Sequence, residues 1–273
     1  MLSFSILALS ALLPALSAAQ QLRSDPGVAG PPLELVHFYN NQWPTGITVS
    51  KTGRKFANYP SGLDPNNTNT GSNQKYAVQE ILPNGTEIPY PSADMNNPPG
   101  GAINYTTTPP SGANYATHLL GVQSVVLDPQ DRLWILDTGR SLTASGTLVF
   151  ASPGGPKLIG VDISSNTIIQ TIVFPPTVAY PDSYLNDVRF DLRSSVTTSG
   201  KGVAYITDSS SEGRNGIVVV DLGTGRAGAT STAHAPYALN PVSYRMYGVN
   251  RFTTFPVRGC PLPPYRWGLM ASP

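Results

Sequence analysis

GVQSVVLDPQDRLWILDTG, residues Gly121 to Gly139, contains two short apolar runs separated by a polar turn. Val125 to Leu127 form the first run, and Leu133 to Leu136 form the second. Between them lie Asp128 to Asp131, a segment with Asp and Pro, which are common turn residues. Short β-branched and aliphatic runs around such a turn predict a β-hairpin.

The same pattern recurs along the chain. Arg54 lies 78 positions before Arg132, and at the same offset Phe56 falls on Trp134 without a gap. A third copy follows after another 63 positions and begins at Asn186. Its second run ends at Asp208, which corresponds to Asp137. The hairpin is therefore one copy of an internal repeat.

Each copy is followed by further strand-like segments. Lys157 to Ile163 and Thr167 to Val173 flank a Ser-Ser-Asn turn. In the third copy, Ile217 to Leu222 is the strand-like segment that corresponds to Lys157 to Ile163. Four short strands per unit, repeated every 60 to 80 residues or so, are typical of β-propeller blades. We therefore predict an all-β propeller with about three blades. A β-sandwich with accidental self-similarity is the alternative.

The N-terminal segment carries a targeting signal. Residues 1–19 contain an apolar run that ends in small residues, which predicts a signal peptide and a secreted, extracellular protein. Three sequons agree with that route and predict glycosylation at Asn66, Asn84 and Asn104. Cys260 is the only cysteine, so an intramolecular disulfide and a thiolate metal site are excluded. A net charge of +1 indicates neither nucleic acid nor a membrane as partner.

Several motifs resemble the major royal jelly protein/Yellow family. They are LWILDTG at Leu133 to Gly139, YLNDVRFD at Tyr184 to Asp191, the segment Ala204 to Ala227, and WPTGITVSKTGRKFANYP at Trp43 to Pro60. The resemblance implies a secreted propeller of the six-bladed type, and it points to a fungal-type member. The family includes dopachrome-converting, amine-binding and nutritional proteins, so membership alone does not decide the function.

Only about half of such a propeller is visible in this chain. We expect a partial propeller domain over residues 33–250 and an irregular tail over residues 251–273, the product of a truncated gene model. Half a propeller exposes unpaired blade edges and an uncovered blade face, so self-association is expected. A second copy that closes the ring would remove both.

A glycine-rich segment and three histidines have structural interpretations. Gly223 to Gly228 has the letters of a dinucleotide fingerprint, but no helix start or acidic residue follows, so a hairpin turn is the favoured interpretation. His37, His118 and His234 are scattered, and a structural role is favoured for each.

Propeller geometry groups a set of polar residues. Inner strands begin, and second strands end, at one face beside the central channel, so these residues are expected to surround one funnel. Carboxylate and amide oxygens there could hold Ca²⁺, and Tyr59 could offer an aromatic face to an amine. The competing interpretation is that the aspartates only cap turns. The predicted site residues are Asp187 and Asp208 as catalytic groups, with Asn186, Gln123, Asp137 and Tyr59 as ligand-binding groups.

Two classes of function remain open. One is an enzyme of the dopachrome-converting type that the resemblance implies, in which Asp187 and Asp208 act as base and acid. The other is an extracellular binder of amines or other small aromatic ligands, with no turnover. An inactive fragment is the third alternative.

Overall fold

The structure, a computed structural model, describes residues 30–31, 33–212 and 215–231. The chain divides into two compact units, residues 1–38 and 39–273.

The predicted signal peptide and the predicted tail, with Cys260 and His234, lie outside the described residues. Within the described part of the chain, no helix has the length and hydrophobicity of a membrane span.

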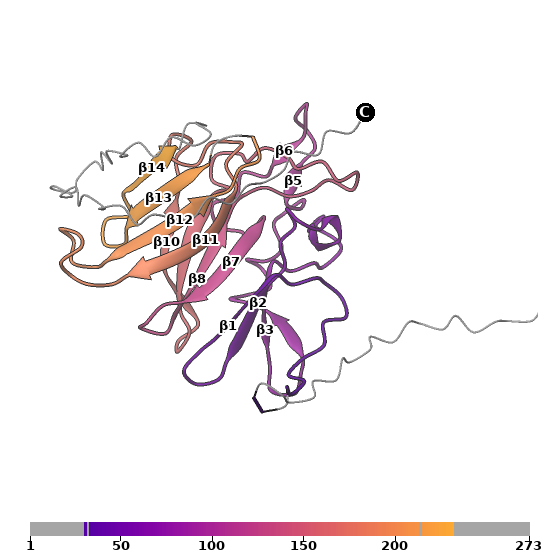
Figure 1. Ribbon diagram of the computed structural model, residues 1–273. Coiled ribbons are helices and arrows are strands. Elements are labelled where there is room, and N and C mark those ends of the chain that lie inside the picture. The colour runs from indigo at the N-terminus through magenta and orange to yellow at the C-terminus, as the bar shows by residue number, and fades with distance from the viewer. Residues whose placement is uncertain (1–29, 32, 213–214, 232–273) are drawn as a thin grey trace, which may run out of the picture. The chain divides into compact units, whose positions relative to one another are not determined.

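The described residues of unit 39–273 form antiparallel β-sheets and one short 3₁₀ helix, Pro65–Asn67 (Figure 1). Three sheets have four strands each, paired in chain order, and we name them sheet 1 (β1 to β4), sheet 2 (β7 to β10) and sheet 3 (β11 to β14). A two-stranded sheet, β5–β6, lies between the first two in the sequence. The strands are β1 Gly46–Val49, β2 Lys55–Asn58, β3 Val78–Ile81, β4 Glu87–Pro89, β5 Ile103–Asn104, β6 Ser111–Gly112, β7 Val122–Leu127, β8 Arg132–Asp137, β9 Lys157–Asp162, β10 Thr167–Val173, β11 Leu185–Asp191, β12 Val203–Asp208, β13 Gly216–Asp221 and β14 Ala227–Ser231.

The hairpin predicted from Gly121 to Gly139 is the β7–β8 pair. Asp131 adopts a left-handed conformation with φ of 63°. The Asp128 carboxylate accepts hydrogen bonds from the backbone N–H of Gln130 (2.8 Å) and from the indole Nε1 of Trp134 (2.8 Å). In the first copy, Ser50 takes this place, and its Oγ accepts from the backbone N–H of Arg54 (2.9 Å). The repeated turn is therefore held by a short polar side chain in both copies.

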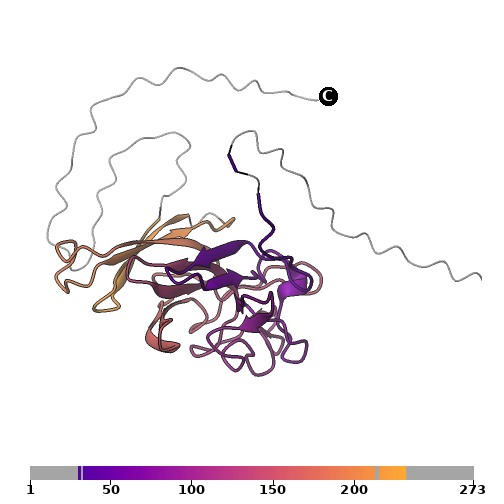
Figure 2. The same cartoon turned by 90° about the horizontal axis from the view of Figure 1, so that it is seen from below.

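The first strands of the three sheets lie together. β7 contacts β1 on one side and β11 on the other (Figures 1 and 2). Each following strand pairs with the one before it, so every sheet runs outward from this shared row of first strands. The predicted all-β class is confirmed, and this arrangement is compatible with a β-propeller.

Sheet 2 is packed on both faces. Alternate residues of β8 point to opposite sides: Leu133 joins the core shared with Phe56 of sheet 1, and Trp134 joins the core shared with Val188 and Ala204 of sheet 3. A two-layer sandwich leaves one face of each sheet outside, so this stacking of three sheets disfavours that alternative.

The segment Gly223 to Gly228 follows β13 and turns into β14, with Gly225 at φ of 69°. The Asp221 carboxylate accepts from the backbone N–H groups of Gly223 (2.8 Å) and Thr224 (3.3 Å). The predicted hairpin turn is confirmed, and no helix follows it within the described residues.

A buried arginine links sheets 2 and 3. Arg140, which follows β8 and is 0% exposed, donates from Nη2 to the Glu212 carboxylate after β12 (2.8 Å). It also donates to the carbonyl oxygens of Val149 and Asp182, each at 2.8 Å. The Arg140 guanidinium lowers the pKa of Glu212 from 4.5 to about 2.

We expect Trp134→Ala to lower the free energy of unfolding by about 3–5 kcal/mol, because it empties a site between two sheets. The matched control is Trp43→Ala, since Trp43 is 70% exposed, and its effect should stay within about 0.5 kcal/mol. Equilibrium denaturation of both variants checks this; equal losses would contradict the packing described above.

We also expect the ion pair between Arg140 and Glu212 to make the stability of the fold depend on pH. Because the folded state lowers the pKa of Glu212, its contribution is complete above pH 4.5 and is lost as the pH falls toward 2. Glu212→Gln should therefore melt at a lower temperature than wild type at pH 6, and the two melting temperatures should converge near pH 2. A constant difference across this range would show that the carboxylate charge is not the cause.

Candidate functional site

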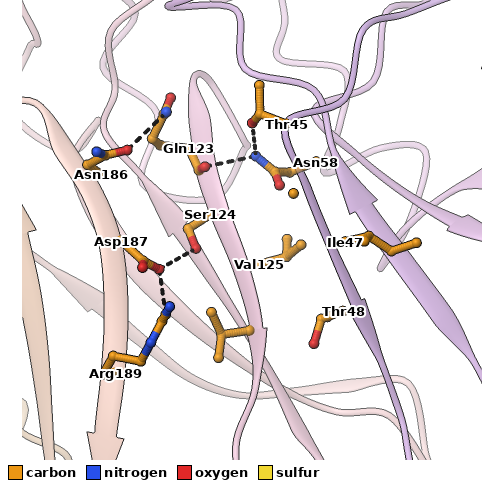
Figure 3. A pocket seen from close by; sticks show the side chains of 12 residues that line it. Thr45, Ile47, Thr48, Asn58, Gln123, Ser124, Val125, Asn186, Asp187 and Arg189 are labelled. Carbon is orange, nitrogen blue, oxygen red and sulfur yellow. Dashed lines mark hydrogen bonds and ion pairs between the residues drawn. The ribbon is translucent and has the colours of Figure 1, made fainter. Parts of the chain in front are cut away.

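The exposed sides of β1, β7 and β11 line an open pocket of about 510 Å³ (Figure 3). The amides of Asn58, Gln123 and Asn186 lie toward one end of the pocket, and Ile47, Thr48 and Arg189 lie further along the strands. The pocket is lined by Thr45, Gly46, Ile47, Thr48, Asn58, Gln123, Ser124, Val125, Val126, Asn186, Asp187 and Arg189.

Irregular pairing brings consecutive residues into the pocket. The β7–β8 register shifts between Val122 and Ser124, and the β11–β12 register shifts between Leu185 and Asp187. In a regular strand, neighbouring side chains point to opposite faces, and a bulge removes this alternation. Gln123 and Ser124, and likewise Asn186 and Asp187, therefore line the same pocket.

A chain of hydrogen bonds sets the orientation of the two amides. The Tyr184 hydroxyl donates to Gln123 Oε1 (2.8 Å), and Gln123 Nε2 donates to Asn186 Oδ1 (3.1 Å) (Figure 3). Burial raises the pKa of Tyr184 to about 12, so its hydroxyl stays protonated and acts as the donor. Because Oδ1 of Asn186 is used as an acceptor, its Nδ2 group is the free donor of that side chain.

Asp187 is the carboxylate of the pocket. Its Oδ1 accepts from Ser124 Oγ (3.2 Å), from the backbone N–H of Val188 (2.8 Å) and from Arg189 Nη1 (2.7 Å). Its side chain is 43% exposed and that of Arg189 is 70% exposed. The ion pair is thus open to solvent, and the partners of Asp187 all converge on one of its two oxygens.

Asn58 closes the floor of the pocket between sheets 1 and 2. It is fully buried, and its Nδ2 donates to the carbonyl oxygen of Gln123 (2.9 Å). Its Oδ1 has no hydrogen-bond partner and lies against Gly46, where a Cβ would stand 2.3 Å from it. Position 46 therefore requires glycine for β1 to pass over this amide.

The structure brings Gln123, Asn186 and Asp187 into one pocket, together with Thr45. It does not bring the other three predicted site residues there. Tyr59 is buried, its hydroxyl donates to Glu87 (2.6 Å), and burial raises its pKa. It therefore offers no ring face to a ligand.

Asp208 is buried and holds the loop that enters β11. Its Oδ1 accepts from the backbone N–H groups of Tyr184 (2.8 Å) and Ser210 (3.1 Å). Asp137 does the same before β7: its carboxylate accepts from the backbone N–H groups of Leu120 (2.8 Å) and Gly121 (2.9 Å). The placement of both aspartates fits the capping interpretation better than a position at the funnel.

Asp137 also forms a fully buried ion pair. Lys157 Nζ lies 2.9 Å from its carboxylate, both side chains are 0% exposed, and the ammonium donates further to the carbonyl oxygens of Gly155 (2.8 Å) and Tyr115 (3.2 Å). Burial lowers the pKa of Lys157, and Asp137 opposes that shift.

Sequence reasoning missed three contributors to the site. Ser124 and Tyr184 escaped because their roles depend on a bulge and on contacts between sheets. Arg189 could have been found, because it stands 63 positions after Val126 on the pocket side of the repeat.

His118 lies beside the ring of Tyr115, with centroids 5.2 Å apart, and does not line the pocket. No group of three or more His, Cys, Asp and Glu side chains among the described residues is placed to hold a metal ion. Ca²⁺ in the channel stays a hypothesis.

Residues 120–237 match the family model of the major royal jelly proteins. The family predicted from the sequence is thereby confirmed over this segment, which contains sheet 2 and sheet 3. No curated protein gives a significant match to the chain.

Two solved structures from B. thetaiotaomicron are similar in part. They are the extracellular domain of a protein described as a one component system, and that of one described as a hybrid two component system. Each is 10% identical with a TM-score of 0.38, and the alignments cover 76% and 79% of this chain but 17% and 18% of those chains. This chain thus spans less than a fifth of their length.

We expect Asp137→Asn to destabilise the fold by about 3–5 kcal/mol, because it leaves Lys157 as a buried charge without its partner. Adding Lys157→Met should recover part of that loss, since the unpaired ammonium is then removed as well. Urea denaturation measures both, with Asp187→Asn as the exposed control. A double variant less stable than the single one would contradict the role given to the ion pair.

Proposed function

We propose that this protein is a secreted β-propeller of the six-bladed type that binds a small amine. The match of residues 120–237 to the family model of the major royal jelly proteins supports the propeller. Sheets 1 to 3 are three of its blades. The ligand binds in the pocket on β1, β7 and β11 and is released without chemical conversion.

The chemistry of the pocket carries this proposal. The Asp187 carboxylate has an oxygen that takes part in none of its three hydrogen bonds, and it suits an ammonium group. Gln123 and Asn186 add amide groups in an orientation set by Tyr184. Further along the strands, the aliphatic side chains of Ile47 and Val126 suit an apolar ring. A charged head next to an apolar wall favours an amphipathic amine.

Binding fits the pocket better than conversion. Tautomerisation needs one group to remove a proton and another to return it. Asp187 is the one carboxylate among the residues that line the pocket, and none of them is a histidine. Asp208, the second group of the enzyme hypothesis, is engaged with two backbone N–H groups.

The secretory route is part of the proposal. The predicted signal peptide supports it, and so does the position of two sequons: Asn66 is exposed within the 3₁₀ helix, and Asn84 is exposed at the β3–β4 turn. Asn104 is half-buried, and its Oδ1 accepts from Thr106 Oγ1 (2.7 Å). Glycans at these three asparagines stay a prediction.

We expect calorimetric titration to detect dopamine binding, and Asp187→Asn to weaken it about tenfold, because a charge-assisted hydrogen bond becomes a neutral one. The control is Asp94→Asn, which changes an exposed carboxylate away from the pocket. Dopachrome should lose its absorbance no faster with protein than without it. Faster decay that requires Asp187 would favour the enzyme, and dopamine binding unaffected by Asp187→Asn would refute the site.

A further inference from the structure

One contact between neighbouring sheets is repeated within the chain. The second strand of each sheet carries an aromatic residue at the same repeat position: Phe56, Trp134 and Tyr205. Phe56 is buried in the core shared with Val125 of sheet 2. Trp134 is buried against sheet 3, where its ring lies 5.2 Å from that of Phe190.

Next to Phe56 and Trp134, residues in the same cross-strand row also form hydrogen bonds to the neighbouring sheet. Thr48, the partner of Phe56 in the register, accepts at Oγ1 from the backbone N–H of Leu127 in sheet 2 (3.2 Å). Gln170, in the row of Trp134, donates from Nε2 to the carbonyl oxygen of Leu222 in sheet 3 (2.9 Å). The aromatic-bearing face of one sheet thus contacts the aliphatic face of the next in both cases.

Sheet 3 presents the same kind of face once more. Arg189, Tyr205 and Val219 are cross-strand partners in one row, as Val126, Trp134 and Gly160 are in sheet 2. Tyr205 and Val219 are only half-buried, whereas Trp134 is 1% exposed. We call Arg189, Tyr205, Thr207 and Val219 the Tyr205 face.

Sheet 1 presents the matching aliphatic side. Val125 and Leu127 of sheet 2 pack against sheet 1, and 78 positions earlier stand Ile47 and Val49. Ile47 is 53% exposed and Val49 is 55% exposed, whereas Val125 is 4% exposed. We call Ile47 and Val49 the Ile47 face.

We propose that two copies of this chain associate head to tail, with the Tyr205 face of each copy on the Ile47 face of the other. The occupant is a second copy because this chain carries both halves of a contact that it already makes twice within itself. β1 and β11 both line the pocket, so this contact would place the first strands of two copies side by side and enclose the pocket between them.

Sedimentation velocity of the wild-type chain should show a dimer at micromolar concentration. Ile47→Asp and Tyr205→Asp should each weaken association by about tenfold or more, because each replaces a large hydrophobic side chain of the contact with a carboxylate that must lose its hydration. The matched control is Ile168→Asp, since Ile168 is also exposed (49%) but lies on β10, outside both faces. Circular dichroism and thermal unfolding verify that each variant is folded.

Mixing the two variants separates this arrangement from any other. An Ile47→Asp copy retains an intact Tyr205 face, and a Tyr205→Asp copy retains an intact Ile47 face, so an equimolar mixture should form heterodimers through one native contact. A mixture that stays monomeric while both variants are folded would overturn the proposal. So would a monomeric wild type, or equal loss of association with Ile168→Asp.

Discussion

The burial of an aromatic side chain between consecutive sheets is the interaction on which the rest of this structure depends. Trp134 shows how it works: its indole N–H is anchored on the Asp128 carboxylate of its own hairpin turn, and its ring lies against Phe190 of the next sheet. The turn fixes the side chain, and the side chain fixes the next sheet. Because Phe56 repeats this contact between sheets 1 and 2, the first strands of all three sheets are held in one row. The pocket exists only because those three strands lie together.

Two bulges convert that row of strands into a chemical site. A regular strand would turn either Gln123 or Ser124 away from the pocket, and the same holds for Asn186 and Asp187. The shifts in register at equivalent positions of β7 and β11 keep both members of each pair on one side. The result is a pocket with amides toward one end, and with aliphatic side chains, Thr48 and Arg189 further along the strands. Among the residues that line this pocket, Asp187 is the one carboxylate.

Position in the repeat explains why similar polar residues have different roles. Asn58, Asp137 and Asp208 stand opposite the first residue of the neighbouring inner strand in the register. The two aspartates accept backbone N–H groups of the loops that enter β7 and β11, so their charge stabilises the fold. Asn58 instead donates to the carbonyl oxygen of Gln123 and ties sheet 1 to sheet 2. Asp187 stands on an inner strand and is open to solvent, which leaves its carboxylate accessible to a ligand.

The sequence by itself determined the all-β class and the positions of the repeated hairpins, because strand alternation and turn residues are local and the repeat multiplies their signal. It also identified Gln123, Asn186 and Asp187 as residues beside the shared row of strands. Only the tertiary structure decided which polar side chains the backbone had already engaged. A buried aspartate that caps a loop and an exposed one that faces a pocket have the same letter in the sequence, and they differ only in burial and in hydrogen-bond partners contributed by distant segments.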